Sequence, residues 1–320
     1  MNYVFGPVPS RRLGRSLGID PIPMKTCNWN CVYCQLGRTS KPTNWQQESV
    51  ATEDIIAEAK SAIALHRSDQ IDWLTFVGSG EPTLHAGLGR MIGALKSFTD
   101  IPIAVITNGS LLYLPEVRRA LLSANAVLPT LDAGTERLYQ RIDRPMSELS
   151  FAKLVGGMDA FRQEFTGQLW LEVMLIRGLN DSEEALLDLA AVISQIQPDQ
   201  VHINLPVRPP TVHSIEVPDN KSLFRARAIL GDVAQVVHHA DITVDLGQDN
   251  SLVDAICGLV RRHPMTCKEL TAALSYGSGE ITDALNQLQM SGNVQEVIRH
   301  NKRFWTSADS QFANHASATH

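Results

Sequence analysis

Short apolar runs alternate with amphipathic stretches from residue 1 to about residue 248. Each run is four to eight residues long and is bounded by turn residues, a pattern that predicts buried strands. The predicted strands are residues 16–22, 73–77, 103–107, 126–131, 169–176 and 200–204, with residues 241–246 as a candidate seventh.

The stretches between these runs predict helices. In residues 52–66 the apolar side chains Ile55, Ile56, Ala59, Ala62 and Ile63 recur at helical spacing, and Thr52 is the expected N-cap. The other predicted helices are residues 88–98, 115–124, 135–142, 150–165, 182–196 and 220–239. Six repeats of strand then helix predict parallel strands with right-handed crossovers. The expected fold is α/β, an open or partial (β/α)6 TIM-like barrel, with its chemistry at the carboxyl ends of the strands.

The pattern changes after residue 250. Residues 251–306 predict three short helices followed by two strand-like runs, 294–299 and 303–305, which is the order of elements in a winged-helix domain. Residues 307–320 are small and polar, and we expect a disordered tail. The predicted division is therefore a barrel over residues 1–248, a winged-helix-like domain over 251–306 and a tail.

Composition narrows the classes of function. The 320 residues are 44% hydrophobic and 19% charged, with a net charge of −6, so the chain can bury a large core and is not globally basic. No apolar run approaches the roughly 18 residues of a membrane span. The first residues lack the charged and apolar regions of a signal peptide, which predicts a cytoplasmic protein.

Three of the five cysteines, Cys27, Cys31 and Cys34, lie within eight residues. An odd cysteine count in a large chain argues against a disulfide scaffold. Three thiolates on one tight loop can bind three corners of a [4Fe–4S] cluster and leave the fourth iron open to a small molecule. The alternative is structural zinc, which needs four ligands. A second CxxC or HxxxH is absent, and Cys257 and Cys267 are isolated.

The CxxxCxxC spacing, with the aromatic Tyr33 before the last cysteine, resembles the signature of the radical S-adenosylmethionine (SAM) superfamily. Three further motifs follow predicted strands in the order of that superfamily: Gly-Ser-Gly-Glu-Pro-Thr at 78–83, Thr-Asn-Gly at 107–109 and Leu-Asp-Ala-Gly at 131–134. The resemblance covers about three-quarters of the chain. The segment Gly-Pro-Val-Pro-Ser-Arg-Arg at 6–12 is similar to Fe–S oxidoreductases related to wybutosine-synthesis enzymes.

This resemblance implies a set of roles. One [4Fe–4S] cluster would be held by Cys27, Cys31 and Cys34, and SAM would chelate its fourth iron. The implied contacts of SAM are the backbone near Tyr33 for adenine, Ser79, Gly80 and Glu81 for the amino group, and Thr107, Asn108 and Asp132 for the methionine and ribose parts. Reductive cleavage of SAM would yield a 5′-deoxyadenosyl radical that takes hydrogen from a substrate. The electron donor would be a flavodoxin or ferredoxin.

The substrate stays open at the level of sequence. RNA modification follows from the subgroup resemblance, and peptide or protein modification from a C-terminal domain that is not basic. A third class is an Fe–S redox-sensing regulator with a DNA-binding winged helix. Residues 251–306 hold six Lys or Arg and five Asp or Glu, so DNA binding is not expected, although Arg299, Lys302 and Arg303 leave weak RNA contact open.

Several side chains allow two interpretations. Glu172 either points into the barrel or faces solvent, and Asp132 could also cap the next helix. Ser79 stands where the superfamily usually has glycine, so its hydroxyl would crowd SAM or add a hydrogen bond. Arg208 could bind a phosphate or carboxylate, or lie on the surface before two prolines. Arg11, Arg12 and Arg15 could likewise meet an anionic substrate or form a solvated turn.

Overall fold

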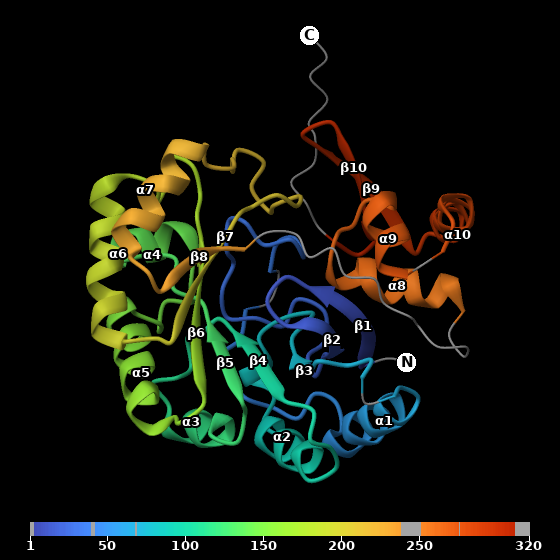
Figure 1. Ribbon diagram of the computed structural model, residues 1–320, viewed down its shortest axis with the longest axis horizontal. Coiled ribbons are helices and arrows are strands. Elements are labelled where there is room, and N and C mark those ends of the chain that lie inside the picture. Colours follow the sequence, from blue (N-terminus) through green and yellow to red (C-terminus); the bar gives the residue numbers. More distant parts are fainter. Residues whose placement is uncertain (1–2, 40–41, 68, 238–250, 275, 311–320) are drawn as a thin grey trace.

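The computed structural model describes residues 3–39, 42–67, 69–237, 251–274 and 276–310. Eight strands form one sheet in chain order, β1 beside β2 and so on to β8, and only β1 runs antiparallel to its neighbour. In the described residues β8 does not pair with β1, so the sheet is an open barrel and the expected α/β class is confirmed (Figure 1). The strands are β1 Val4–Ser10, β2 Gly14–Ile19, β3 Trp73–Phe76, β4 Ile103–Thr107, β5 Ala126–Pro129, β6 Gln168–Met174, β7 Gln200–Asn204 and β8 Ala234–Val236.

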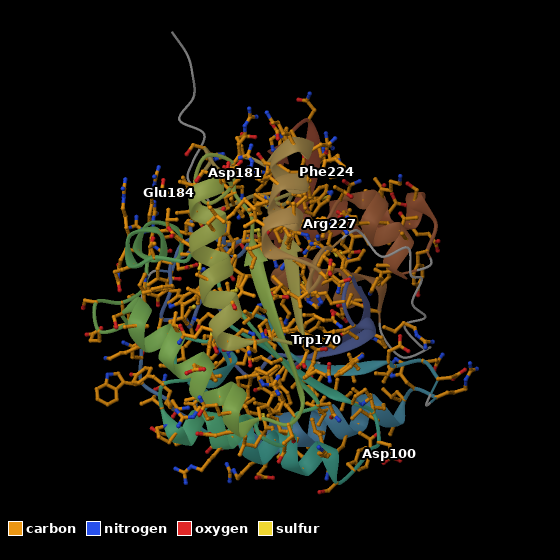
Figure 2. All side chains as sticks on the ribbon, turned by 60° about the vertical axis from the view of Figure 1, so that its left-hand side comes forward. Asp100, Trp170, Asp181, Glu184, Phe224 and Arg227 are labelled. Carbon is orange, nitrogen blue, oxygen red and sulfur yellow. The ribbon has the colours of Figure 1, made fainter. Side chains whose placement is uncertain are left out.

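Helices cover the outer face of this sheet (Figure 1). They are α1 Thr52–Ala64, the 3-10 turn η1 Pro82–Leu84, α2 Leu88–Lys96, α3 Pro115–Leu121, α4 Glu136–Ile142, α5 Phe151–Glu164, α6 Glu183–Ile196 and α7 Asn220–Leu230. The last two lie side by side, and Figure 2 labels Glu184 on α6 and Phe224 and Arg227 on α7.

The two faces of the sheet differ in polarity because neighbouring strand residues point to opposite sides. Leu74 and Phe76 of β3 belong to the large core beneath the helices. Thr75 points to the inner face, where its hydroxyl lies 2.6 Å from that of Ser16. A small apolar cluster that includes Leu13 and Trp170 fills part of this inner face, and polar side chains are left for the site.

Three details differ from the sequence prediction. Strand β1 was not predicted, because Pro7 and Pro9 argue against a central strand; β1 lies at the edge of the sheet, where proline is tolerated. The predicted helix 220–239 is wrong beyond Leu230, since Gly231 ends α7 and β8 follows. The candidate strand 241–246 lies outside the described residues.

The N-cap prediction for Thr52 is also wrong. The cap of α1 is Ala51, and Thr52 is the first helical residue. Its backbone N–H donates to the Glu48 carboxylate at 2.7 Å. A side chain four residues earlier thus satisfies a donor that a capping hydroxyl would otherwise serve.

The elements that follow the barrel lie in residues 251–310, here called the C-terminal domain. They are α8 Leu252–Arg262, α9 Cys267–Leu274 and α10 Ser278–Met290, followed by a hairpin of β9 Val294–Arg299 and β10 Lys302–Ser307. Three helices and a hairpin thus occur in the expected order. Their apolar cluster includes Ile256, Leu285 and Trp305, and Phe5 of β1 joins it. The domain therefore packs against the first strand of the barrel (Figure 1). Ser307, the first residue of the expected tail, is instead the last residue of β10, and residues 311–320 lie outside the described residues.

Among the described helices, none is both long enough and apolar enough to span a membrane.

Candidate functional site

The three clustered cysteines lie on the loop that follows β2, and all three side chains are half-buried. The loop turns on itself, since the Cys34 N–H donates to the Cys31 carbonyl at 3.1 Å. Hydrogen-bond donors already face sulfur: the Trp29 N–H lies 3.4 Å from Cys27 Sγ, and Lys25 Nζ lies 3.2 Å from Cys34 Sγ. Hydrogen bonds to sulfur and a nearby positive charge are features of Fe–S sites.

The donor set fits a cluster. Burial raises the pKa of the Cys27 thiol to about 12 and that of Cys31 well above its ordinary value, so binding of iron would displace protons from these thiols. Within the described ranges no three Cys, His, Asp or Glu side chains converge as the ligands of one metal ion would. In a four-iron cluster each thiolate instead binds a different iron.

The loop after β3, residues 78–81, lies directly against the cysteine loop. The Lys25 N–H donates to the Ser79 carbonyl at 2.6 Å, and the Glu81 N–H donates to the Thr26 carbonyl at 2.9 Å. A Cβ atom on Gly80 would lie 1.9 Å from the Thr26 oxygen, so only glycine allows this close approach. Backbone hydrogen bonds therefore join the predicted SAM loop to the predicted cluster loop.

Glu81 is the centre of a buried hydrogen-bond network. Its Oε1 accepts from the Thr83 N–H and hydroxyl and from the Thr107 hydroxyl, at 3.0, 2.6 and 2.5 Å, and its Oε2 accepts from the Asn108 N–H at 2.6 Å. Burial raises the pKa of this carboxyl, and the four donors oppose the rise. The carboxylate joins the ends of β3 and β4, which leaves the backbone of this loop as the part that could meet SAM.

Asn108 connects the end of β4 to the cysteine loop. Its amide Nδ2 donates to Asn28 Oδ1 at 2.7 Å and lies 3.8 Å from Cys27 Sγ. Asn28 in turn donates to the Ser110 hydroxyl at 2.8 Å. The side-chain amides of Asn108 and Asn28 therefore hold the loop around Cys27 in place by hydrogen bonds.

Tyr33 and Asp132 form the opposite side of the site. The Tyr33 hydroxyl donates to Asp132 Oδ2 at 2.5 Å, and the Met174 N–H donates to Oδ1 at 2.6 Å. Burial raises the pKa of Asp132 to about 6, and it raises the pKa of the neighbouring Asp143 further, with the Asp132 charge as the next cause. A negative charge on one of the two carboxyls therefore disfavours a negative charge on the other. The alternative of Asp132 as a helix cap is wrong, since Thr135 caps α4.

Glu172 points into the barrel and does not face solvent. It is 9% exposed, and its Oε1 lies 2.6 Å from Arg12 Nη1, which also donates to Asn204 at 3.2 Å. Arg208 is likewise directed inward: its Nη1 donates to Gln35 Oε1 at 3.2 Å, one residue after Cys34. Arg12 of the first turn and Arg208 thus point into the barrel, and Arg208 contacts the cysteine loop. Arg15 instead forms a partly exposed pair with Asp72, with 2.6 Å between its Nη2 and Asp72 Oδ1.

The two arginines of the C-terminal hairpin, Arg299 and Arg303, differ in burial and in their partners. Arg299 is buried, and its Nη2 donates to the barrel carbonyls of Pro206 and Ile215 at 3.0 and 2.7 Å. Arg303 forms a surface pair with Glu296 at 3.2 Å. Arg299 therefore joins the domain to the barrel, so it is not a side chain that a nucleic acid could contact freely.

The fold thus gathers the predicted site residues around the cysteine loop in three groups. Ser79 and Gly80 contact its start, Glu81, Thr107 and Asn108 support Cys27, and Tyr33 with Asp132 lies beside Cys31. Sequence reasoning missed Asp20, Asn28 and Asp143. A signal existed for Asp20, a carboxylate at the end of a strand. Asp143 lies outside every motif, at the C-terminal end of α4, and only the fold brings it near Asp132.

Comparison with known proteins agrees with this geometry. The family model described as the Radical SAM superfamily matches residues 22–190. A protein named GTPase Obg from Brachyspira hyodysenteriae is 37% identical over 298 residues, 92% of this chain, but the chain spans only 44% of that protein. UPF0026 protein MJ1312 of Methanocaldococcus jannaschii is 39% identical over 233 residues, covering 73% of this chain and 72% of the relative.

More distant similarities include dual-specificity RNA methyltransferase RlmN of Geotalea uraniireducens, 25% identical over 241 residues, 71% of this chain and 66% of that protein. The crystal structure of a radical SAM methyltransferase from Sphaerobacter thermophilus superposes with a TM-score of 0.54 at 19% identity, covering 69% of this chain and 65% of the other, and it supports the fold alone. The family model matches more than half of the chain, and the cysteine loop described above lies within the matched residues. The chain therefore belongs to the radical SAM superfamily, enzymes that use a [4Fe–4S] cluster and SAM.

Proposed function

We propose that this radical SAM enzyme uses its 5′-deoxyadenosyl radical to modify RNA. The cluster supplies the electron that cleaves SAM when both are bound. The chain's own residues would do the rest: Cys27, Cys31 and Cys34 hold iron, the backbone of residues 79–81 orients the amino group of SAM, and Tyr33 with Asp132 bounds the opposite side. The observation that carries the choice of RNA is the arrangement of arginines beside the cysteine loop.

Four arginines, here called the cationic group, come from three segments: Arg11 and Arg12 from the turn after β1, Arg208 from the loop after β7, and Arg262 from the end of α8. Their proximity is visible in His263, whose pKa is lowered first by burial and then by all four of them. Arg12 pairs with Glu172 and Arg262 with Asp20. Two members of the group contact Gln35, the residue after Cys34: Arg208 through its side chain and Arg262 through its carbonyl. Positive charge beside the cysteine loop would favour an anionic substrate.

The guanidinium of Arg208 has an N–H group that could bind a substrate. Burial, then Arg11, lowers its pKa to about 10, so it stays charged at neutral pH. Its Nε is buried and has no hydrogen-bond partner in the part of the chain that the structure describes. Because this atom is buried, only a group that enters the site beside Gln35 could accept its hydrogen bond, and a phosphate oxygen would be a suitable acceptor there.

An exposed aromatic side chain lies near the same loop. Trp45 is 82% exposed, and the Thr43 N–H two residues earlier donates to the Cys27 carbonyl at 3.2 Å. Unpaired bases of RNA stack on such rings. An aromatic ring and arginines around one cysteine loop suit a nucleotide better than a simple phosphorylated metabolite, and the similarity to an RNA methyltransferase supports the same choice.

The test is coupling of SAM cleavage to RNA. Anaerobically reconstituted, reduced protein would be given SAM with either unfractionated cellular RNA or a pool of cellular peptides, and 5′-deoxyadenosine would be measured. We expect RNA to raise the rate above the rate without substrate, and ribonuclease treatment to abolish the increase. Arg208→Gln should reduce the RNA-dependent increase, while Arg38→Gln, which changes an exposed arginine close to the same loop, should not.

Stimulation by peptides and not by RNA would contradict the proposal and favour the peptide alternative. One feature supports that alternative: a pocket of about 200 Å³ between the loop after β7 and β9, lined by Pro209, Pro210, Val297 and Ile298 among others. The DNA-binding regulator has less support, because α10, the expected recognition helix, carries Glu280 and Asp283 and no Lys or Arg.

A further inference from the structure

The last residue of α8 crosses from the C-terminal domain into the barrel. Arg262 Nε lies 2.7 Å from Asp20 Oδ2, and the two side chains are only 6% and 3% exposed. Asp20 directly follows β2 and precedes the cysteine loop. An ion pair this deeply buried is costly to form, and it persists only where surrounding hydrogen bonds complete it.

Those hydrogen bonds come from the loop that is expected to hold SAM. Asp20 Oδ1 accepts from the Ser79 N–H at 3.0 Å, and Oδ2 accepts from the Ser79 hydroxyl at 2.6 Å. The preceding residue, Gly78, has φ +152°, and a Cβ there would lie 2.3 Å from Asp20 Cγ. The carboxylate therefore fixes both the backbone and the side chain of Ser79.

Arg262 itself is held on several sides. Its Nη1 donates to the Gly258 carbonyl at 3.0 Å within α8, and its guanidinium stacks over the ring of Phe5 at 4.6 Å. Gln35, the residue after Cys34, donates to the Arg262 carbonyl at 3.2 Å. The end of α8 is thus bonded to the SAM loop through Asp20 and to the cluster loop through Gln35.

We propose that Arg262 is a positioning residue for SAM: acting through Asp20, it holds Ser79 so that the loop of residues 79–81 presents its backbone to the amino group of SAM. The C-terminal domain then completes the SAM site of the barrel, in addition to any contact with substrate. The proposal rests on the SAM part of the proposed function and is independent of RNA as substrate.

The decisive variant is Arg262→Gln in the full-length reconstituted protein. Without the cation, the buried Asp20 carboxylate loses its charge partner and the Ser79 loop can shift. We expect iron content to stay at the wild-type level and the SAM dissociation constant to rise about 10- to 100-fold, the usual range for residues that orient a ligand's direct contacts. The change that SAM causes in the electron paramagnetic resonance spectrum of the reduced cluster should require correspondingly more SAM. At saturating SAM, the rate of 5′-deoxyadenosine formation should return towards wild type.

Three matched variants sharpen the test. Arg261→Gln changes the exposed neighbour on the same helix and should leave SAM affinity unchanged. Arg262→Lys keeps the charge and should restore part of the affinity. The double variant of Asp20→Asn with Arg262→Gln should bind SAM no more weakly than the worse single variant, because both act through one interaction.

Wild-type SAM affinity in Arg262→Gln would overturn the proposal. Loss of iron from that variant would overturn it too, since Arg262 would then support the cluster loop through Gln35 and not the SAM loop. Failure of RNA to stimulate the wild-type enzyme would leave this result intact. Absence of SAM binding to the wild type would instead refute the proposed function.

Discussion

The barrel and the C-terminal domain use buried charge in opposite ways. The barrel buries carboxyl groups, Glu81 and Asp132, whose hydrogen-bond donors come from the barrel itself. The C-terminal domain buries Arg262 and Arg299, whose side chains bond to acceptors of the barrel, although Arg262 also donates to Gly258 within α8. Glu81 and Asp132 are therefore satisfied within the barrel, whereas each of the two buried arginines has a barrel acceptor only when the domain is docked. An apolar interface would tolerate sliding, but these hydrogen bonds specify one position.

The largest expected effect is the loss of iron when cysteines of the barrel, and not those of the C-terminal domain, are replaced. Cys27→Ala, Cys31→Ala and Cys34→Ala should each abolish the cluster, reducing iron from about four per chain to almost none, because each removes one of three ligands. Iron and sulfide analysis after anaerobic reconstitution measures this. Cys257→Ala and Cys267→Ala, in the C-terminal domain, are the matched controls and should keep full iron. Retention of iron in any barrel variant would contradict the ligand assignment.

Removal of the C-terminal domain is expected to have the next largest effect. A chain ending near Gln248 would retain the three cysteines and all the predicted SAM contacts, so two independent regions would lead us to expect that it keeps its cluster and cleaves SAM. The structure changes that expectation, because the shortened chain leaves Asp20 without Arg262 and exposes Phe5. Breaking a buried ion pair costs about 3–5 kcal/mol. We expect a clear fall in thermal stability and weak SAM binding, measured by calorimetry. A stable fragment with normal SAM affinity would show that the two regions are independent.

Within the barrel, Glu81→Gln should destabilise the site while leaving the cysteines in place. The amide replaces one acceptor oxygen with a donor that faces the existing donors from Thr83, Thr107 and Asn108. Hydrogen bonds to a charged group contribute about 1.5–3 kcal/mol each, so we expect a loss of about 2–4 kcal/mol in the free energy of unfolding. Denaturant titration measures it. Glu116→Gln, on the exposed side of α3, should change little, and an equal effect of both variants would argue against the network.

The smallest expected effect compares two arginines of the same hairpin. Arg299→Ala removes two hydrogen bonds to barrel carbonyls and should cost about 1–3 kcal/mol. Arg303→Ala removes an exposed pair with Glu296 and should cost about 0–1 kcal/mol. If the two variants lost equal stability, the docking role of Arg299 would be wrong. Gel filtration and thermal melts of both proteins would give the comparison.

Many residues of the site could be predicted from local sequence patterns. Cys27, Cys31, Cys34 and the motifs at residues 78–83, 107–109 and 131–134 each follow a predicted strand, and parallel strands bring their carboxyl ends together. Boundaries were less predictable. Gly231 ends α7 in the middle of a sequence that continues a helical pattern, and the prolines of β1 concealed an edge strand. In both places the environment of the sheet overrode local preference.

The sequence by itself determined the strand–helix alternation, the cysteine loop and the order of motifs around it, because these depend on residues that are neighbours in the chain. Only the tertiary structure decided which charges meet. Arg262 reaches Asp20 across 242 positions, and Asp143 approaches Asp132 from the far end of a helix. No local pattern encodes such pairs, because a buried charge chooses its partner from whatever the packed elements bring within hydrogen-bond distance.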